Sequence, residues 1–206
     1  FRKLTIEVTT LCNLKCAGCP RTVAVNDGAW VNKSMDLDDF KAILNNLPFV
    51  NMVTLHGIGE PTLHKNFIDI VDAAKQSSKF RKIKITTNAL AKPAEFYLEA
   101  QKKGLDEIWI SVDSINQSLS TKLRENTNIV KIQETIKLLA QKKFAPSISM
   151  TVSALNFREC LFSAHALLEL GAKTIHMQEY QDFGETEGVM TIQERLEFVE
   201  RCIEYS

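Results

Sequence analysis

The sequence lacks the features that mark several classes of protein. No apolar run approaches the roughly 20 residues that a membrane-spanning helix needs. The 25 basic and 25 acidic side chains cancel, so the charge gives no sign of a nucleic-acid-binding surface or of an anionic membrane as a partner. Neither an internal repeat nor a low-complexity tract is present. We therefore expect a globular protein that binds neither nucleic acid nor membrane.

Cysteines are few, and their distribution is uneven. Cys12, Cys16 and Cys19 fall within eight residues, whereas Cys160 and Cys202 stand alone. An odd number of cysteines clustered in this way is a poor disulfide framework and a good metal site. Thiolates that are kept available for a metal imply a reducing compartment, so we expect a cytoplasmic protein.

The length and composition fit one domain. The chain has 206 residues, of which 45% are apolar and 24% are charged, and this is enough for a substantial core. It begins at Phe1 instead of Met, and Glu194–Ser206 has the pattern of a helix without a stop signal. We expect residues 1–206 to form one domain that can belong to a longer polypeptide.

Short runs rich in Ile, Val, Thr or Trp alternate with helical patterns along the chain. The predicted strands are Leu4–Thr9, Met52–His56, Lys82–Thr86, Glu107–Val112, Ser147–Val152 and Lys173–Met177. Between them, apolar residues such as Ile132, Ile136 and Leu139 recur at helical spacing. This alternation predicts a parallel sheet with right-handed crossovers. Because a complete eight-stranded barrel needs about 250 residues, we predict an α/β fold of the (βα)6 type, a partial TIM-type barrel.

Two stretches have no regular pattern. Arg21–Lys33 is predicted to loop over the cysteine segment, and Asp182–Gly188 is an acidic loop after the last strand. In parallel α/β folds, the loops at the C-terminal ends of the strands carry the chemistry. The motifs described next all follow predicted strands.

The clustered cysteines follow the first strand directly, with the spacing C-x3-C-x2-C. This spacing can place three thiolates around one cuboidal iron–sulfur cluster, which normally takes four cysteines. With no fourth cysteine nearby, one iron keeps an open position, which suits a catalytic cluster better than an electron carrier. A structural zinc site is the alternative, but it needs four closed ligands. The histidines that could complete such a site are scattered, at His56, His64, His165 and His176.

The cysteine motif resembles the signature of the radical S-adenosylmethionine (radical SAM) superfamily. The resemblance implies a [4Fe–4S] cluster on Cys12, Cys16 and Cys19, with S-adenosyl-L-methionine chelating the open iron through its methionyl amine and carboxylate. An electron from the cluster cleaves the sulfonium C–S bond, and a 5′-deoxyadenosyl radical then abstracts hydrogen from a substrate. An electron donor such as flavodoxin or ferredoxin is also implied. One departure is Gly18, since the family usually has an aromatic residue there, and this is expected to loosen the packing near the adenine.

The turn after the second predicted strand supports the resemblance. Ile58-Gly59-Glu60 is similar to the Gly-Gly-Glu motif of the family, with Ile in place of the first Gly. In the family this turn offers backbone groups and a carboxylate to the methionyl ammonium, which implies that Gly59 and Glu60 bind the cofactor. Taken alone, glycines at this place indicate only a tight turn.

Segments after the third and fourth strands also resemble family segments that lie along the cofactor. They contain Asn88 and, in Ser111-Val112-Asp113, a serine and an aspartate. Ser111 resembles the hydroxyl that contacts the ribose or the carboxylate, and Asn88 is a candidate for the same role. For Asn88 and Asp113, a strand-end turn with a capping side chain is the alternative.

Two further residues are cofactor-binding candidates. Arg124 resembles the arginine with which many peptide-modifying members hold the methionyl carboxylate, and a guanidinium suits this bidentate task. A solvated helix arginine is the alternative. Asn156 follows the fifth strand in a segment that resembles one near the adenine, or it is the N-cap of the next helix.

The combined pattern most resembles the subgroup whose barrel is followed by a cysteine-rich SPASM or twitch domain. Members of this subgroup modify ribosomal peptides or proteins, or oxidise alcohols and sugars. The resemblance therefore implies a radical SAM enzyme that acts on a peptide or protein side chain. The same chemistry on a sugar, nucleoside or cofactor precursor remains open, as does a non-catalytic iron–sulfur or zinc module that binds a partner.

Overall fold

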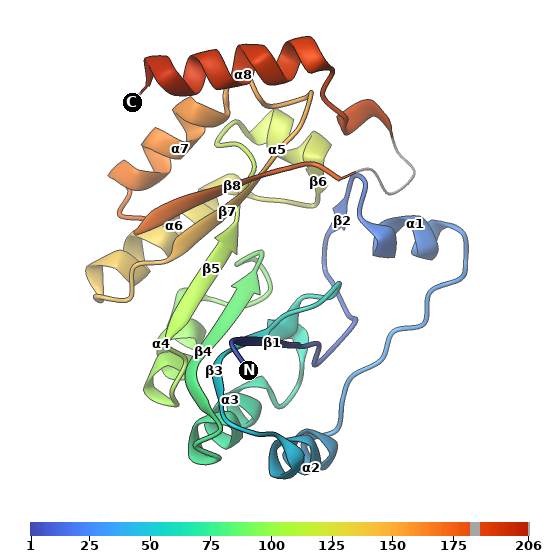
Figure 1. Cartoon of the computed structure of the whole chain (residues 1–206), viewed down its shortest axis with the longest axis vertical. Coiled ribbons are helices and arrows are strands. Elements are labelled where there is room, and N and C mark those ends of the chain that lie inside the picture. Colours follow the sequence, from blue (N-terminus) through green and yellow to red (C-terminus); the bar gives the residue numbers. More distant parts are fainter. Residues whose placement is uncertain (182–185, 206) are drawn as a thin grey trace.

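The main sheet has six parallel strands in the order β1-β3-β4-β5-β7-β8. The computed structural model describes residues 1–181 and 186–205. The strands of the sheet are β1 (Lys3–Ile6), β3 (Val50–Leu55), β4 (Phe80–Thr87), β5 (Glu107–Ser111), β7 (Ser147–Val152) and β8 (Thr174–Glu179). Figure 1 shows that the sheet curls into a half-barrel with an open side.

Helices cover the convex face of the curled sheet (Figure 1). They are α2 (Leu37–Asn46), α3 (Phe67–Gln76), α4 (Ala94–Lys102), α6 (Ile129–Gln141) and α7 (Cys160–Glu169). Shorter elements lie near the open side: α1 (Pro20–Asn26), η1 (Pro61–Leu63), α5 (Gln117–Leu123) and η2 (Thr186–Gly188). The longer helix α8 (Ile192–Glu204) lies beyond α7 (Figure 1). A separate antiparallel pair joins β2 (Lys15–Cys16) to β6 (Arg124–Glu125). In the described part of the chain, no helix is both long and apolar enough to cross a bilayer.

The two faces of the sheet differ in character, because side chains alternate along each strand. On the convex face, Ile83 and Ile85 of β4 are fully buried against the helices. On the concave face, the intervening Lys84 is half-buried, and its Nζ lies 3.4 Å from the ring centroid of Trp109 on β5. Closed barrels fill their interior with branched aliphatic side chains. The polar concave face here leaves room for ligands instead.

The predicted fold is confirmed, and the six predicted strands are all present in nearly the predicted bounds. The prediction of a loop over Arg21–Lys33 is wrong in its first part. Pro20–Asn26 forms helix α1, with Pro20 in the first turn, where proline fits because the missing N–H has no helical partner. Of the predicted loop Asp182–Gly188, residues 182–185 lie outside the described residues, and Thr186–Gly188 forms a 3-10 turn.

The covering helices stabilise the sheet through apolar burial, which a pair of substitutions on α6 can test. Ile136 is fully buried, while Val130 on the same helix is 57% exposed. We expect Ile136→Ala to lower the free energy of unfolding by about 2–5 kcal/mol, because it removes buried methyl groups and leaves a cavity. Val130→Ala should change it by less than about 0.5 kcal/mol. Urea unfolding followed by circular dichroism measures both, and equal losses would contradict this account of the fold.

Candidate active site

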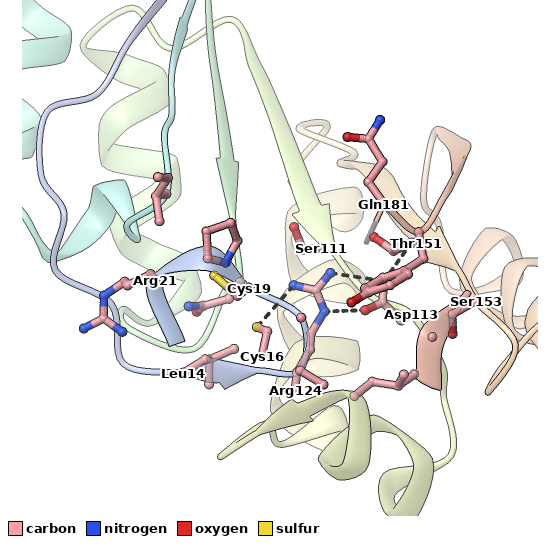
Figure 2. A pocket seen from close by; sticks show the side chains of 18 of the residues that line it. Leu14, Cys16, Cys19, Arg21, Ser111, Asp113, Arg124, Thr151, Ser153 and Gln181 are labelled. Atoms are coloured by element: carbon pink, nitrogen blue, oxygen red, sulfur yellow. Dashed lines mark hydrogen bonds and ion pairs between the residues drawn. The ribbon is translucent and has the colours of Figure 1, made fainter. Parts of the chain in front are cut away.

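A cavity of about 880 Å³ opens at the C-terminal ends of the strands. This volume lies in the range of small-molecule and cofactor sites. The cavity brings together most of the residues predicted from the sequence: Cys12, Cys16, Cys19, Gly59, Glu60, Asn88, Ser111 and Arg124. Figure 2 shows Cys16 and Cys19 on one side of it, Ser111 and Asp113 on the other, and Arg124 between them.

The cysteine loop, residues 9–19, is held on one side by the strand pair β2–β6. Cys16 is paired with Arg124 in this ladder, and the N–H of Ala17 donates to the carbonyl of Leu123 at 2.9 Å. The loop is therefore fixed by backbone hydrogen bonds to a segment more than 100 residues later in the sequence.

The opposite side of the cysteine loop is held by the ends of β3 and β4. The Glu60 N–H donates to the carbonyl of Leu11 at 2.6 Å. The side-chain amide of Asn88 donates to Oδ1 of Asn13 at 2.9 Å. These contacts orient the loop over the strand ends, so that its cysteines face the cavity.

The thiols of the loop form the donor set of the cavity. They are half-buried, and burial raises the pKa of Cys12 and raises that of Cys16 to about 11, opposed at Cys16 by the Arg124 cation. Cys160 and Cys202 lie on α7 and α8, outside the cavity wall. No three metal-binding side chains of the described residues converge as a single ion requires. In a cubane each cysteine binds a different iron, so three thiols and an open side fit a [4Fe–4S] cluster.

Gly18, between the second and third cysteines of the loop, makes room for Tyr180. Gly18 has φ of +66°, and a Cβ there would lie 2.0 Å from the hydroxyl oxygen of Tyr180. On the other side, a Cβ at Gly188 would lie 2.9 Å from the same ring. The expectation that Gly18 leaves this place loosely packed is wrong. The ring of Tyr180, which follows β8 and lines the cavity, fills the space.

The turn that contains Gly59 approaches the cysteine loop too closely for a side chain. A Cβ at Gly59 would lie 2.2 Å from the carbonyl oxygen of Thr9. The carboxylate of Glu7 accepts hydrogen bonds from the N–H groups of Ile58, at 2.5 Å, and of Gly59, at 3.1 Å. Glu7 was not among the predicted site residues. The signal that could have identified Glu7 is its position at the end of the first strand, where parallel α/β folds place functional residues.

Glu60 is buried, with 3% of its surface exposed. Its Oε1 accepts from the N–H and the hydroxyl of Thr62 and from the hydroxyl of Thr87, and its Oε2 accepts from the N–H of Asn88 at 2.7 Å. Burial raises the pKa of Glu60, and these hydrogen bonds oppose the shift. The carboxylate thus joins the ends of β3 and β4 in addition to lining the cavity.

Asn88 and Ser111 stand at the ends of neighbouring strands. The Oδ1 atom of Asn88 accepts from the N–H of Leu90 at 2.9 Å, which is the capping turn considered from the sequence. Asn88 also lines the cavity, so the turn and a contact with a ligand are compatible. Ser111 ends β5, half-buried in the cavity wall, beside Ser149 of β7.

Arg124 is largely buried, with 19% of its side chain exposed, so the alternative of a solvated arginine is wrong. Its Nε and Nη2 donate to the two carboxylate oxygens of Asp113, at 2.6 Å and 3.1 Å. Its Nη1 lies 3.9 Å from Sγ of Cys16. Burial disfavours the charge, but Asp113 and Cys16 outweigh it and raise the pKa of Arg124. Asp113 was noted in the sequence only as part of a motif.

Asn156 is buried behind the cavity wall and does not line it. Its amide donates to the carbonyls of Asp113 and Thr151, both at 2.9 Å, and its Oδ1 accepts from the N–H of Ser153 at 2.7 Å. It is not the N-cap of α7, since that position is Glu159. Asn156 therefore acts on the site through the strand ends that it joins.

Two proteins are similar in sequence to most of this chain. A cofactor-modifying protein for tungsten-containing aldehyde ferredoxin oxidoreductase from Pyrococcus furiosus is 28% identical over 183 residues, which cover 83% of this chain and 49% of that protein. The subtilosin biosynthesis protein AlbA from Bacillus subtilis is 29% identical over 185 residues, covering 87% of this chain and 40% of AlbA. The chain thus spans about half or less of the length of these relatives.

Solved structures share the fold. SuiB from Streptococcus suis, in a crystal structure with its precursor peptide SuiA, superposes with a TM-score of 0.77 at 17% identity, covering 98% of this chain and 45% of SuiB. Residues 6–157 match the family described as the Radical SAM superfamily, whose members are enzymes that use a [4Fe–4S] cluster and S-adenosylmethionine. This match covers most of the chain, including the cysteine loop and the ends of β3, β4, β5 and β7. The chain belongs to the radical SAM superfamily.

Proposed function

We propose that Cys12, Cys16 and Cys19 bind a [4Fe–4S] cluster and that the cavity beside them binds S-adenosylmethionine. The observation that carries the proposal is the convergence of three half-buried cysteines and the predicted cofactor residues on one cavity. When bound, such a cluster would supply the electron for reductive cleavage of S-adenosylmethionine, and the chemistry made available would be hydrogen abstraction from a substrate.

The residues of the chain position the cofactor in this proposal. Gly59 lets the turn approach the cysteine loop, and Glu60 and Asn88 fix the strand ends that face the methionyl group. Ser111 offers a hydroxyl, and Arg124 keeps N–H groups that Asp113 does not use. A guanidinium paired on one edge can hold a carboxylate on another.

For the substrate, we propose a peptide or protein side chain. Support comes from the names of AlbA, a bacteriocin biosynthesis protein, and of SuiB, whose structure contains a precursor peptide. The cavity also reaches the edge strand β8 at Gln178 and the residues after it at Tyr180 and Gln181. A cofactor precursor is the second candidate, supported by the name of the Pyrococcus furiosus relative.

The proposed chemistry also bears on the compartment of the protein and on its electron donor. We propose that residues 1–206 act as one radical SAM core domain in the cytoplasm. A reducing compartment keeps the cysteines available, and a flavodoxin or ferredoxin would supply the electron.

The metal content tests the first part of the proposal. Anaerobic reconstitution should give about four irons and four sulfides per chain, as a cubane requires. Replacing Cys12, Cys16 or Cys19 with Ala should remove most of both, whereas Cys160→Ala and Cys202→Ala serve as controls and should keep them. Iron and sulfide assays with absorbance spectra measure this. Stoichiometric zinc without sulfide would overturn the proposal.

The cofactor site can be tested with two serines that are partners in the sheet. Ser111 lines the cavity, and Ser149 is its register neighbour outside the cavity wall. We expect Ser111→Ala to weaken S-adenosylmethionine binding roughly 10- to 100-fold, the loss of one hydrogen bond to a charged group. Ser149→Ala should bind normally. Isothermal titration of the reconstituted protein compares them, and an unchanged Kd for Ser111→Ala would show that Ser111 does not contact the cofactor.

The substrate class can be tested by following the transfer of deuterium from a labelled substrate to 5′-deoxyadenosine. The reduced protein with S-adenosylmethionine should release 5′-deoxyadenosine, and mass spectrometry detects deuterium in it when the substrate is deuterated. We expect deuterium transfer from peptides labelled at their side chains. Transfer from a labelled nucleotide such as GTP, and none from peptides, would favour the cofactor-precursor alternative.

A further inference from the structure

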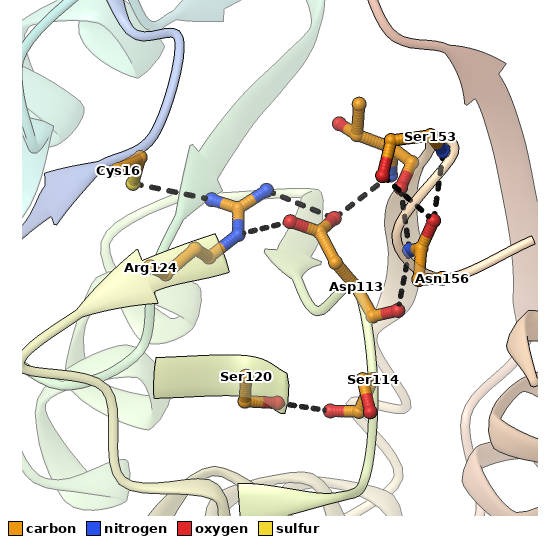
Figure 3. A network of polar contacts seen from close by, with 8 residues as sticks. Cys16, Asp113, Ser114, Ser120, Arg124, Ser153 and Asn156 are labelled. Atoms are coloured by element: carbon orange, nitrogen blue, oxygen red, sulfur yellow. Dashed lines mark hydrogen bonds and ion pairs between the residues drawn. The ribbon is translucent and has the colours of Figure 1, made fainter. Parts of the chain in front are cut away.

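The side chain of Arg124 lies between the cysteine loop and Asp113, at the end of β5. Arg124 is paired with Cys16 in the β2–β6 ladder, so the backbone places the arginine directly opposite a proposed cluster ligand. Its Nη1 atom lies 3.9 Å from Sγ of Cys16. Figure 3 shows the guanidinium lying between this sulfur and the carboxylate of Asp113.

Asp113 fixes the guanidinium in this orientation. It accepts from Nε and Nη2 on one edge of the group, and two parallel hydrogen bonds define the plane of an arginine. Asp113 is itself held, because its Oδ1 accepts from the N–H of Thr151 at 2.8 Å and its backbone carbonyl accepts from Asn156 at 2.9 Å. The orientation of Arg124 is thus determined by the ends of β5 and β7.

Because Asp113 accepts from Nε and Nη2, the Nη1 group of Arg124 is the one directed at Sγ of Cys16. A sulfur bound to iron is a thiolate, and a charged donor beside it makes a stronger hydrogen bond than a neutral one. Hydrogen bonds to the sulfurs and nearby charge are among the factors that set the potential of iron–sulfur clusters. Reduction adds one negative charge to the cluster, and a cation at this distance in a largely buried site stabilises the reduced form.

We propose that the Arg124–Asp113 ion pair sets the reduction potential of the cluster, with Arg124 as the cation beside the Cys16 sulfur and Asp113 as its positioning residue and counter-charge. This inference rests on the proposed function, since it requires a cluster on Cys16. It assigns to Arg124 an effect that exists before S-adenosylmethionine binds. Arg124 raises the potential, and the negative charge of Asp113 limits that effect.

The test is a redox titration of the anaerobically reconstituted chain without S-adenosylmethionine. Dithionite supplies one electron per cluster, and electron paramagnetic resonance follows the reduced state. We expect Arg124→Gln to shift the midpoint potential to more negative values, because the reduced cluster loses its cation. Asp113→Asn should shift it to more positive values, because the cation loses its counter-charge. The double variant should fall between the two.

A second bidentate pair in the chain provides the control. Arg158 donates through Nε and Nη2 to Glu197, both at 3.0 Å, and neither residue lines the cavity. Arg158→Gln and Glu197→Gln should leave the potential unchanged. If Arg124→Gln does not retain its cluster, Arg124→Lys replaces it. This variant keeps the charge, but an ammonium cannot serve Asp113 and Cys16 together, so a smaller negative shift is expected.

The outcomes separate this inference from the proposed function. A parental protein that forms no cluster, or a Cys16→Ala variant that keeps a full one, overturns the proposed function. A cluster that is retained in Arg124→Gln at the parental potential overturns the role of Arg124. A negative shift in Asp113→Asn overturns the role of Asp113 as a counter-charge.

Discussion

The carboxylate of Glu60, which lies in the turn after β3, accepts hydrogen bonds from the end of β4, while the backbone N–H of the same residue holds the cysteine loop. A buried carboxylate without partners would be costly, and this one is compensated entirely by donors of the chain. Because those donors come from Thr62, Thr87 and Asn88, the ends of β3 and β4 must keep a fixed separation. The position of the loop above them follows from that separation.

A second buried carboxylate performs the corresponding task on the other side of the cavity. Asp113 joins β5 to β7 by accepting from the N–H of Thr151, and it also accepts from Arg124. The backbone of Arg124 is paired with Cys16 of the cysteine loop. The loop is therefore held between two carboxylates, of which Glu60 accepts from neutral donors and Asp113 is paired with Arg124. The site does not depend on a rigid loop sequence, since its geometry is imposed from the strands on either side.

The sequence predicted the fold and the membership of the site because both depend on local pattern. Strands alternate with helices, so the ends of parallel strands had to gather the cysteines, Glu60 and Ser111 at one place. The β2–β6 pair could not be predicted, because two-residue strands have no periodicity. The ion pair of Arg124 with Asp113 could not be predicted either. Asp113 follows β5 and Arg124 follows α5, so their contact depends on how these elements pack. Asn156 lies in a segment that was predicted to be near the cofactor, but its neighbours Ser153 and Leu155 line the cavity and Asn156 does not.

The ring of Tyr180 between Gly18 and Gly188 links positions that are distant in the chain. A side chain at either glycine would require the ring of Tyr180 to shift, and an aromatic residue at position 18 would compete with that ring for the same space. We therefore expect substitutions at positions 18, 180 and 188 to be coupled. A chain with a large residue at position 18 is expected to carry a smaller one at position 180, so that a single aromatic group fills this part of the cavity.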